Sequence, residues 1–161
     1  MPFENNTVIK FLFISNAHRS RRPYLDPSTR YRCYNPAEDI EILGHLADVT
    51  SFISFKVEMI KHYDVFIFHR PPDDPKLEKA LDLIDKQRKL VFADYDDLIF
   101  SPEHALDSPL YKLRLPDKQK VIALYQKNYN AMSKFEHFTV STKPLGKILG
   151  NLKKENSINI K

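Results

Sequence analysis

The stretch Lys89-Leu-Val-Phe-Ala-Asp-Tyr-Asp-Asp-Leu-Ile-Phe100 decides the fold that we expect for this chain. Leu90 to Ala93 form an apolar run without a polar break, which is typical of a strand buried on both faces of a sheet. Three acids follow, Asp94, Asp96 and Asp97. Because an unpaired carboxylate is costly to bury, we expect the strand to end where the acids begin. The acids would then lie at the carboxyl edge of an open parallel sheet, where ligands bind.

Length and composition indicate one globular domain. The chain has 161 residues, of which 42% are hydrophobic and 29% charged, and its net charge of +4 is mildly basic. The single cysteine, Cys33, cannot form an internal disulfide and is typical of a reducing compartment, so we expect a cytoplasmic protein. The first apolar run, residues 8–14, contains Lys10 and is too short for a signal peptide or a membrane span.

Strand-like runs alternate with amphipathic segments along the rest of the chain. Strands are expected at residues 8–14, 49–53, 63–70, 90–93 and 137–142. Helices are expected after the cap signals Asn35-Pro36, Asp74-Pro75 and Asp117, with short ones at 56–62 and 143–149 and loops at 15–34 and 101–116. This alternation predicts an α/β fold: a Rossmann-like three-layer α/β/α domain over residues 1–150, with a mainly parallel sheet of about five strands. We expect the 90–93 strand at its centre and a polar, basic tail at 151–161.

The same topology would gather polar side chains at one edge, because the carboxyl ends of parallel strands lie together. The expected first loop carries His18, Arg19, Arg21, Arg22, Arg30 and Arg32. Arg70 follows the third strand and Ser141-Thr142 the fifth. No Gly-x-Gly-x-x-Gly motif and no phosphate-binding P-loop is present, and the six histidines show no metal-ligand spacing. We therefore expect no cofactor, no metal site and no nucleic-acid partner.

An ordered set of motifs resembles the amino-terminal half of bacterial GT-B glycosyltransferases, which build surface polysaccharides. The set consists of Arg30-Tyr31-Arg32, Asn35-Pro36, Gly44, Tyr63-Asp64-Val65, Arg70-Pro71, Asp94-Tyr95-Asp96-Asp97-Leu98 and Val140-Ser141-Thr142. The resemblance implies a domain that holds a glycan or lipid-linked acceptor, while a second domain holds the nucleotide-sugar donor. The chain ends at Lys161 without such a domain, so we expect it to be inactive alone. Peripheral contact with a membrane is a further expectation.

The resemblance also implies roles for the residues at the carboxyl edge. In sugar transfer an acceptor hydroxyl loses a proton and a diphosphate departs, so Asp94 or Asp96 would be the catalytic carboxylate. The expected substrate-binding residues are Arg30, Arg32, Arg70, Asp97, Ser141 and Thr142, the arginines through forked hydrogen bonds to an anion. A structural alternative is that the arginines pair with the aspartates and lock the loops together, while Ser141 and Thr142 cap the last helix.

Two other functions share these residues. The strand followed by Asp94-x-Asp96 also resembles the first motif of haloacid-dehalogenase-type phosphatases, although Leu98 replaces the usual threonine or valine. Glu155 is the only acid after Thr142, so the later magnesium-binding acids of that family are missing. A non-catalytic Rossmann-like binding domain is the third hypothesis. A pair between Arg70 and Asp96 would favour the transferase, and a bound magnesium ion the phosphatase.

Overall fold

The computed structural model describes residues 7–16, 23–114 and 117–158, so His18, Arg19, Arg21 and Arg22 lie outside the described part. Its centre is a five-stranded sheet in which all neighbours are parallel. The strands are β1 (Lys10–Ser15), β2 (Leu46–Ser51), β3 (Val65–His69), β4 (Leu90–Tyr95) and β5 (His137–Val140). The Rossmann-like α/β fold expected from the sequence is thereby confirmed, with strands close to the expected ranges.

The strand order is β2-β1-β3-β4-β5, so β3 is the central strand. The expectation that the Asp94 strand would be central is wrong by one position, since β4 lies between β3 and β5. All five residues of β3 are buried, whereas Leu90 at the start of β4 is exposed. The chain first adds β2 on one side of β1 and then returns to add β3 on the other side. The carboxyl ends of β1 and β3 therefore flank the topological switch point, where ligands bind in open α/β sheets.

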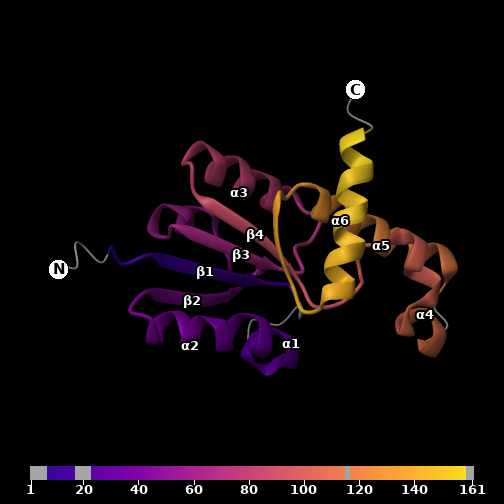
Figure 1. Ribbon diagram of the computed structural model, residues 1–161, viewed down its shortest axis with the longest axis horizontal. Coiled ribbons are helices and arrows are strands. Elements are labelled where there is room, and N and C mark those ends of the chain that lie inside the picture. The colour runs from indigo at the N-terminus through magenta and orange to yellow at the C-terminus, as the bar shows by residue number, and fades with distance from the viewer. Residues whose placement is uncertain (1–6, 17–22, 115–116, 159–161) are drawn as a thin grey trace.

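The helices are shared unequally between the two faces of the sheet (Figure 1). One face carries η3 (Val57–His62), α3 (Pro75–Lys86), α5 (Lys118–Ser133) and α6 (Lys143–Ile158). Asp74 and Asp117 cap α3 and α5 through hydrogen bonds from the backbone N–H groups of Lys76 and Gln119, as their sequences predict. The opposite face is covered by a helical arm, residues 27–42, whose Cys33 and Ala37 pack on Phe13, Val65 and Ile67.

The helical arm begins earlier than the sequence indicates. It consists of α1 (Pro27–Thr29), the π-helical turn η2 (Arg30–Tyr34) and α2 (Asn35–Ile42), and the side chain of Asp26 caps it by accepting the N–H of Thr29 at 2.8 Å. Pro36 has no N–H to donate to the carbonyl four residues before it, and the helix widens so that Asn35 N–H donates to Arg30 O. Asn35-Pro36 therefore lies within the arm and is not its start, and Arg30 and Arg32 are helical.

Two further segments are more helical than expected. The segment predicted as a loop after β4 contains η4 (Pro102–Asp107) and α4 (Pro109–Arg114). Helix α6 continues through Gly150 and includes residues 151–158 of the expected tail, because Leu145, Leu149 and Leu152 extend one apolar stripe along it. None of the helices in the described ranges is long and apolar enough to cross a membrane.

Tyr95, the last residue of β4, is an exception in an otherwise well-satisfied core. Its side chain is fully buried and its ring packs against Phe100 at a centroid distance of 4.6 Å. Among the described residues, the Tyr95 hydroxyl is the one buried side-chain polar atom without a hydrogen-bond partner. Burial, and then the nearby charge of Asp94, raise the pKa of Tyr95. An unpaired buried hydroxyl lowers stability, because it has lost its hydrogen bonds to water.

We therefore expect Tyr95→Phe to stabilise the fold by about 1 kcal/mol. The matched control is Tyr63→Phe, because the Tyr63 hydroxyl donates to Asp48 Oδ2 at 2.8 Å, and losing that bond should cost about 0.5–1 kcal/mol. Urea denaturation of both variants measures the two changes in the free energy of unfolding. A loss of stability in Tyr95→Phe as large as in Tyr63→Phe would contradict the assignment of an unpaired hydroxyl.

Candidate functional site

Four charged side chains from three parts of the fold meet at the carboxyl edge of the sheet. Asp94 belongs to β4 and Asp96 follows it, while Arg70 follows β3 directly. Arg32 reaches the same edge from the helical arm. The expected convergence of these four residues is therefore observed, and each aspartate forms an ion pair with one arginine.

Asp94 lies inside the sheet, where the sequence had predicted that the strand would already have ended. β4 continues through Asp94 and Tyr95, and the side chain of Asp94 is only 2% exposed. Its burial is possible because Arg32 donates through Nε to Oδ2 at 3.0 Å and through Nη2 to Oδ1, while the Thr139 hydroxyl also donates to Oδ1. The hydrogen bond to Asp94 is the main reason why the pKa of Arg32 is raised. A bidentate pair of this kind compensates for the loss of hydration of a buried carboxylate.

Asp96 is held by three side chains from two parts of the chain, the end of β3 and the helical arm. Arg70 Nε donates to Oδ1 at 2.7 Å, the Ser28 hydroxyl donates to Oδ2, and His69 Nε2 lies 3.2 Å from Oδ1. Burial by itself would raise the pKa of Asp96, but the hydrogen bonds from His69, Arg70 and Ser28 outweigh it and lower the pKa well below its ordinary value. Asp96 is therefore a carboxylate over the whole physiological range and a weak base.

His69 is a site residue that the sequence reasoning missed. Its side chain is fully buried at the end of β3, with Nδ1 3.0 Å from Ser15 Oγ and Nε2 3.2 Å from Ser28 Oγ. Ser15 Oγ in turn lies 2.7 Å from the hydroxyl of Thr29 on the arm. The order serine, histidine, aspartate is that of a hydrolase triad, but Ser15 is only 1% exposed and cannot reach a substrate. The sequence did contain a signal for this role, because His69 is a polar residue at the end of an otherwise apolar strand and directly precedes Arg70.

The other expected site residues differ in their surroundings. Arg30 is exposed on the arm, and Asp97 is exposed with Oδ1 accepting the N–H of Leu98 at 2.9 Å. The Ser141 hydroxyl donates to the backbone carbonyl of Asp96, which ties β5 to the acidic loop. Thr142 Oγ1 accepts the N–H of Leu145 at 3.4 Å, the arrangement of a helix cap, so the structural alternative for Thr142 is supported.

Arg70 has an unusual backbone conformation for a residue with a side chain. Its φ angle is 52°, in the left-handed region that favours glycine, and its N–H donates to the carbonyl of Asp94 at 2.9 Å. The left-handed turn directs the chain away from β3 while the side chain reaches Asp96. Arg88, at the end of α3, has a similar φ angle of 54° but lies near the amino edge of the sheet. The two arginines therefore form a natural pair for comparison.

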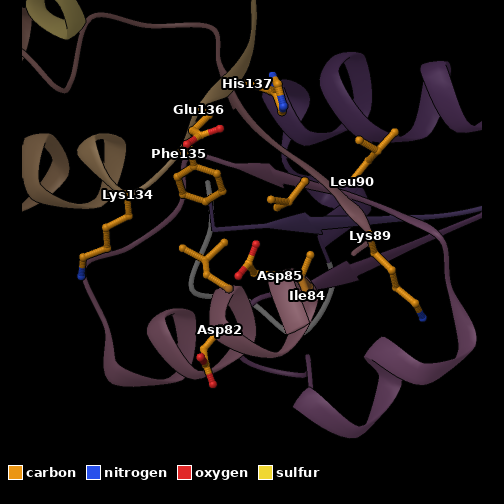
Figure 2. Close-up of a pocket in the computed structure, with 11 residues that line it drawn as sticks. Asp82, Ile84, Asp85, Lys89, Leu90, Lys134, Phe135, Glu136 and His137 are labelled. Atoms are coloured by element: carbon orange, nitrogen blue, oxygen red, sulfur yellow. The ribbon is translucent and has the colours of Figure 1, made fainter. Parts of the chain in front are cut away.

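Two cavities differ in their position relative to the ion pairs: one lies far from them, and the other has one of the pairs in its lining. One of about 370 Å³ is at the amino edge of the sheet, where Ile84, Leu90 and Phe135 line it, and Lys89 and Lys134 extend away from it (Figure 2). Those lysines bond to Ile60 O and to Asp73 and Glu78, respectively. A second cavity of about 290 Å³ lies over the face beneath the arm and is mostly apolar, with the Arg32–Asp94 pair and Thr139 in its lining.

Comparisons with known proteins leave the function to be inferred from this geometry. No protein-family model and no curated protein sequence matches the chain. Within the described ranges, no group of three or more histidine, cysteine, aspartate and glutamate side chains is arranged to hold a metal ion. The chemistry available at the carboxyl edge is that of two oriented arginines, an exposed carboxylate and several hydroxyls.

Removing Arg32 should be far more damaging than removing its exposed neighbour Arg30. We expect Arg32→Ala to cost about 3–5 kcal/mol of stability, because it leaves the buried carboxylate of Asp94 without its partner. Arg30→Ala, the matched control on the same turn, should change stability by no more than about 0.5 kcal/mol. Adding Asp94→Asn to Arg32→Ala should recover part of the loss, since it removes the unpaired charge. Equal effects of the two arginine variants in denaturant melts would show that the pair does not hold the arm.

The pair of Arg70 and Asp96 should appear as a coupling energy in a double-mutant cycle. We expect Arg70→Ala and Asp96→Asn together to cost about 1–3 kcal/mol less than the sum of the single changes, because both side chains are largely buried. The lowered pKa of Asp96 means that the pair stabilises the protein above the pKa of an unfolded aspartate, about 3.9, and that this contribution falls as acid protonates Asp96 in the fold.

Urea melts of the four proteins at pH 7 and at decreasing pH, with and without millimolar magnesium, measure this coupling. Strictly additive costs together with stabilisation by magnesium would contradict the arginine pair and favour the phosphatase hypothesis.

Proposed function

We propose that this chain is the acceptor-side domain of a bacterial GT-B glycosyltransferase, which transfers a sugar from a nucleotide-sugar donor to a glycan or lipid-linked acceptor in surface polysaccharide synthesis. In this proposal a second domain holds the donor, and the chain alone does not catalyse transfer. The observation that carries the proposal is that two aspartates orient two arginines, Arg32 and Arg70, at the carboxyl edge of a parallel sheet.

The two arginines keep donors for a ligand after pairing with the aspartates. Arg70 uses Nε for Asp96, and its Nη groups make no hydrogen bond to the described residues. Arg32 uses Nε and Nη2 for Asp94, which leaves Nη1. Both side chains are about a quarter exposed, with 23% for Arg32 and 24% for Arg70. Guanidinium groups fixed in this way suit phosphate oxygens, such as those of a departing diphosphate or an anionic acceptor.

The three acids have different roles in the proposal. Asp94 is buried, and both of its oxygens accept hydrogen bonds, so we assign it the role of positioning Arg32. Asp96 positions Arg70 in the same way, and its lowered pKa makes it a poor acceptor of a proton. Asp97 is the acid of this group that is exposed, and we assign it the contact with acceptor hydroxyls.

The same contacts weigh against the phosphatase alternative. In that alternative Asp94 would attack phosphorus with a free carboxylate oxygen, but Arg32 and Thr139 occupy its oxygens and the side chain is 2% exposed. A non-catalytic binding domain, in contrast, would use the oriented arginines just as a transferase domain does. The two differ in whether a donor domain joins the site, so binding and turnover have to be measured separately.

The proposal predicts weak anion binding at Arg70 and no turnover by the chain alone. Calorimetry with inorganic pyrophosphate and with uridine, guanosine and thymidine diphosphate sugars should give affinities weaker than micromolar. A separate assay of the same mixtures should detect no released sugar. Arg70→Ala should weaken pyrophosphate binding by about 10- to 100-fold, since a charge-assisted hydrogen bond contributes about 1.5–3 kcal/mol. Arg88→Ala, with its similar backbone at the other edge, is the control and should leave binding unchanged.

Two results would overturn the proposal that this chain holds the acceptor while a second domain holds the donor. Micromolar binding of a nucleotide sugar by the 161-residue chain would mean that the donor site lies within it. Equal loss of pyrophosphate binding in Arg70→Ala and Arg88→Ala would mean that the carboxyl edge is not an anion site.

A further inference from the structure

A third cavity lies next to Asp97 on the side of the site away from the arm. Its volume is about 310 Å³, at the lower end of the ~300–1,000 Å³ typical of small-molecule pockets. Its walls come from the segment after β4, from η4 and from α5. The residues that matter for its chemistry are Asp97, Ile99, His104, Leu124, Tyr125 and Asn128.

The polar lining residues offer both acceptors and a donor. Asp97 uses one oxygen, Oδ1, for the N–H of Leu98 and keeps Oδ2. Asn128 donates through Nδ2 to the carbonyl of Ile99 at 2.9 Å, so its Oδ1 is the atom left to accept a hydrogen bond. Carboxylate and amide oxygens of this kind accept hydrogen bonds from hydroxyl groups.

The donor is His104. Its Nδ1 lies 2.8 Å from the hydroxyl oxygen of Ser101, which is only 1% exposed. A buried hydroxyl needs an acceptor for its own proton, and Nδ1 is within reach to accept it, so we assign a ring proton of His104 to Nε2. His104 is half-buried and lines the cavity, and among the residues that the structure describes none accepts a hydrogen bond from its Nε2.

The remaining lining determines which ligands fit. Ile99, Leu124 and Tyr125 form an apolar wall, and Leu124 is 44% exposed. Asp107 also lines the cavity, with Oδ1 3.4 Å from Lys112 Nζ, and Asp97 makes no ion pair with the described residues, so the lining favours a neutral ligand over a phosphate or carboxylate. A neutral ring that carries hydroxyl groups around its rim and C–H groups on its faces matches both parts of the lining. The phosphate group of the proposed function would bind at Arg70 instead. Arg70 pairs with Asp96, the residue directly before Asp97.

We propose that this cavity binds a neutral hexose ring, with Asp97 accepting hydrogen bonds from ring hydroxyls and His104 donating one through Nε2. The assignment of this ring as the terminal sugar of the acceptor rests on the proposed function, whereas sugar binding itself rests only on the cavity.

The test is an NMR titration of the 161-residue chain with methyl α-glucoside, methyl β-galactoside and methyl N-acetyl-β-glucosaminide. At least one glycoside should give saturable amide shifts in residues 97–109 and in α5 around Asn128. Asp97→Asn, which keeps the bond to Leu98, should weaken that binding about tenfold, and His104→Ala should weaken it similarly. The matched control is Asp82→Asn, because Asp82 is an exposed acid on the lining of the amino-edge cavity.

Several outcomes would overturn the proposal. They are the absence of saturable shifts with every glycoside, shifts that map to another surface, and binding that neither Asp97→Asn nor His104→Ala weakens in proteins with native spectra. In a parallel titration with protonated glucosamine, salt-sensitive binding of that amine without binding of any neutral glycoside would overturn the proposal and identify a cation site. If Arg70→Ala does not weaken pyrophosphate binding more than Arg88→Ala does, but the glycosides still bind, the transferase proposal is wrong and the sugar-binding proposal is supported.

Discussion

The buried ion pair between Arg32 and Asp94 is the interaction on which the rest of this structure depends. A carboxylate that is 2% exposed within a strand is tolerated only when its charge and both oxygens are satisfied. Arg32 supplies the positive charge and donates to both oxygens of Asp94. Because Arg32 belongs to the helical arm and Asp94 to the sheet, the pair fixes how the arm lies on the sheet. Cys33 and Ala37 then cover Phe13, Val65 and Ile67, which closes that side of the core.

Once the arm is fixed, a second polar cluster can form at the switch point between β1 and β3. Ser28 and Thr29 come from the arm, and they contact Asp96 and Ser15 while His69 lies between them. Because Asp96 accepts hydrogen bonds from three donors, it is a rigid anchor for Arg70. Arginines that are oriented before a ligand arrives lose less conformational entropy on binding, so under the proposed function the buried cluster would contribute to affinity without touching the ligand.

The charges divide the carboxyl edge into two regions. Arg32 and Arg70, each paired with an aspartate, present guanidinium donors in one region, while Asp97 and Asp107 place carboxylates on the lining of the adjoining cavity. A substrate that combines a phosphate with a neutral sugar would match both regions in a single orientation. Asp96 and Asp97 are adjacent and directly follow β4, so the positions of both depend on where β4 ends.

Local signals in the sequence determined much of this protein. The strands follow from runs such as 65–69, which are apolar enough to be buried on both faces, and α3 and α5 begin where Asp74 and Asp117 cap them, because a cap needs only neighbouring residues. The convergence of Arg70 with Asp96 was also predictable, since parallel strands share an edge.

The burial of Asp94, the early start of the arm, the role of His69 and the length of α6 became clear only from the tertiary structure. For Asp94 and His69 the deciding partner is distant in the sequence: Arg32 is 62 residues from Asp94, and Ser15 is 54 residues from His69. For the arm and α6, the apolar surface on which each helix packs also comes from distant parts of the chain. Periodicity and capping report what a residue does with its neighbours along the chain. Whether a charge can be buried depends on which partner the fold brings to it.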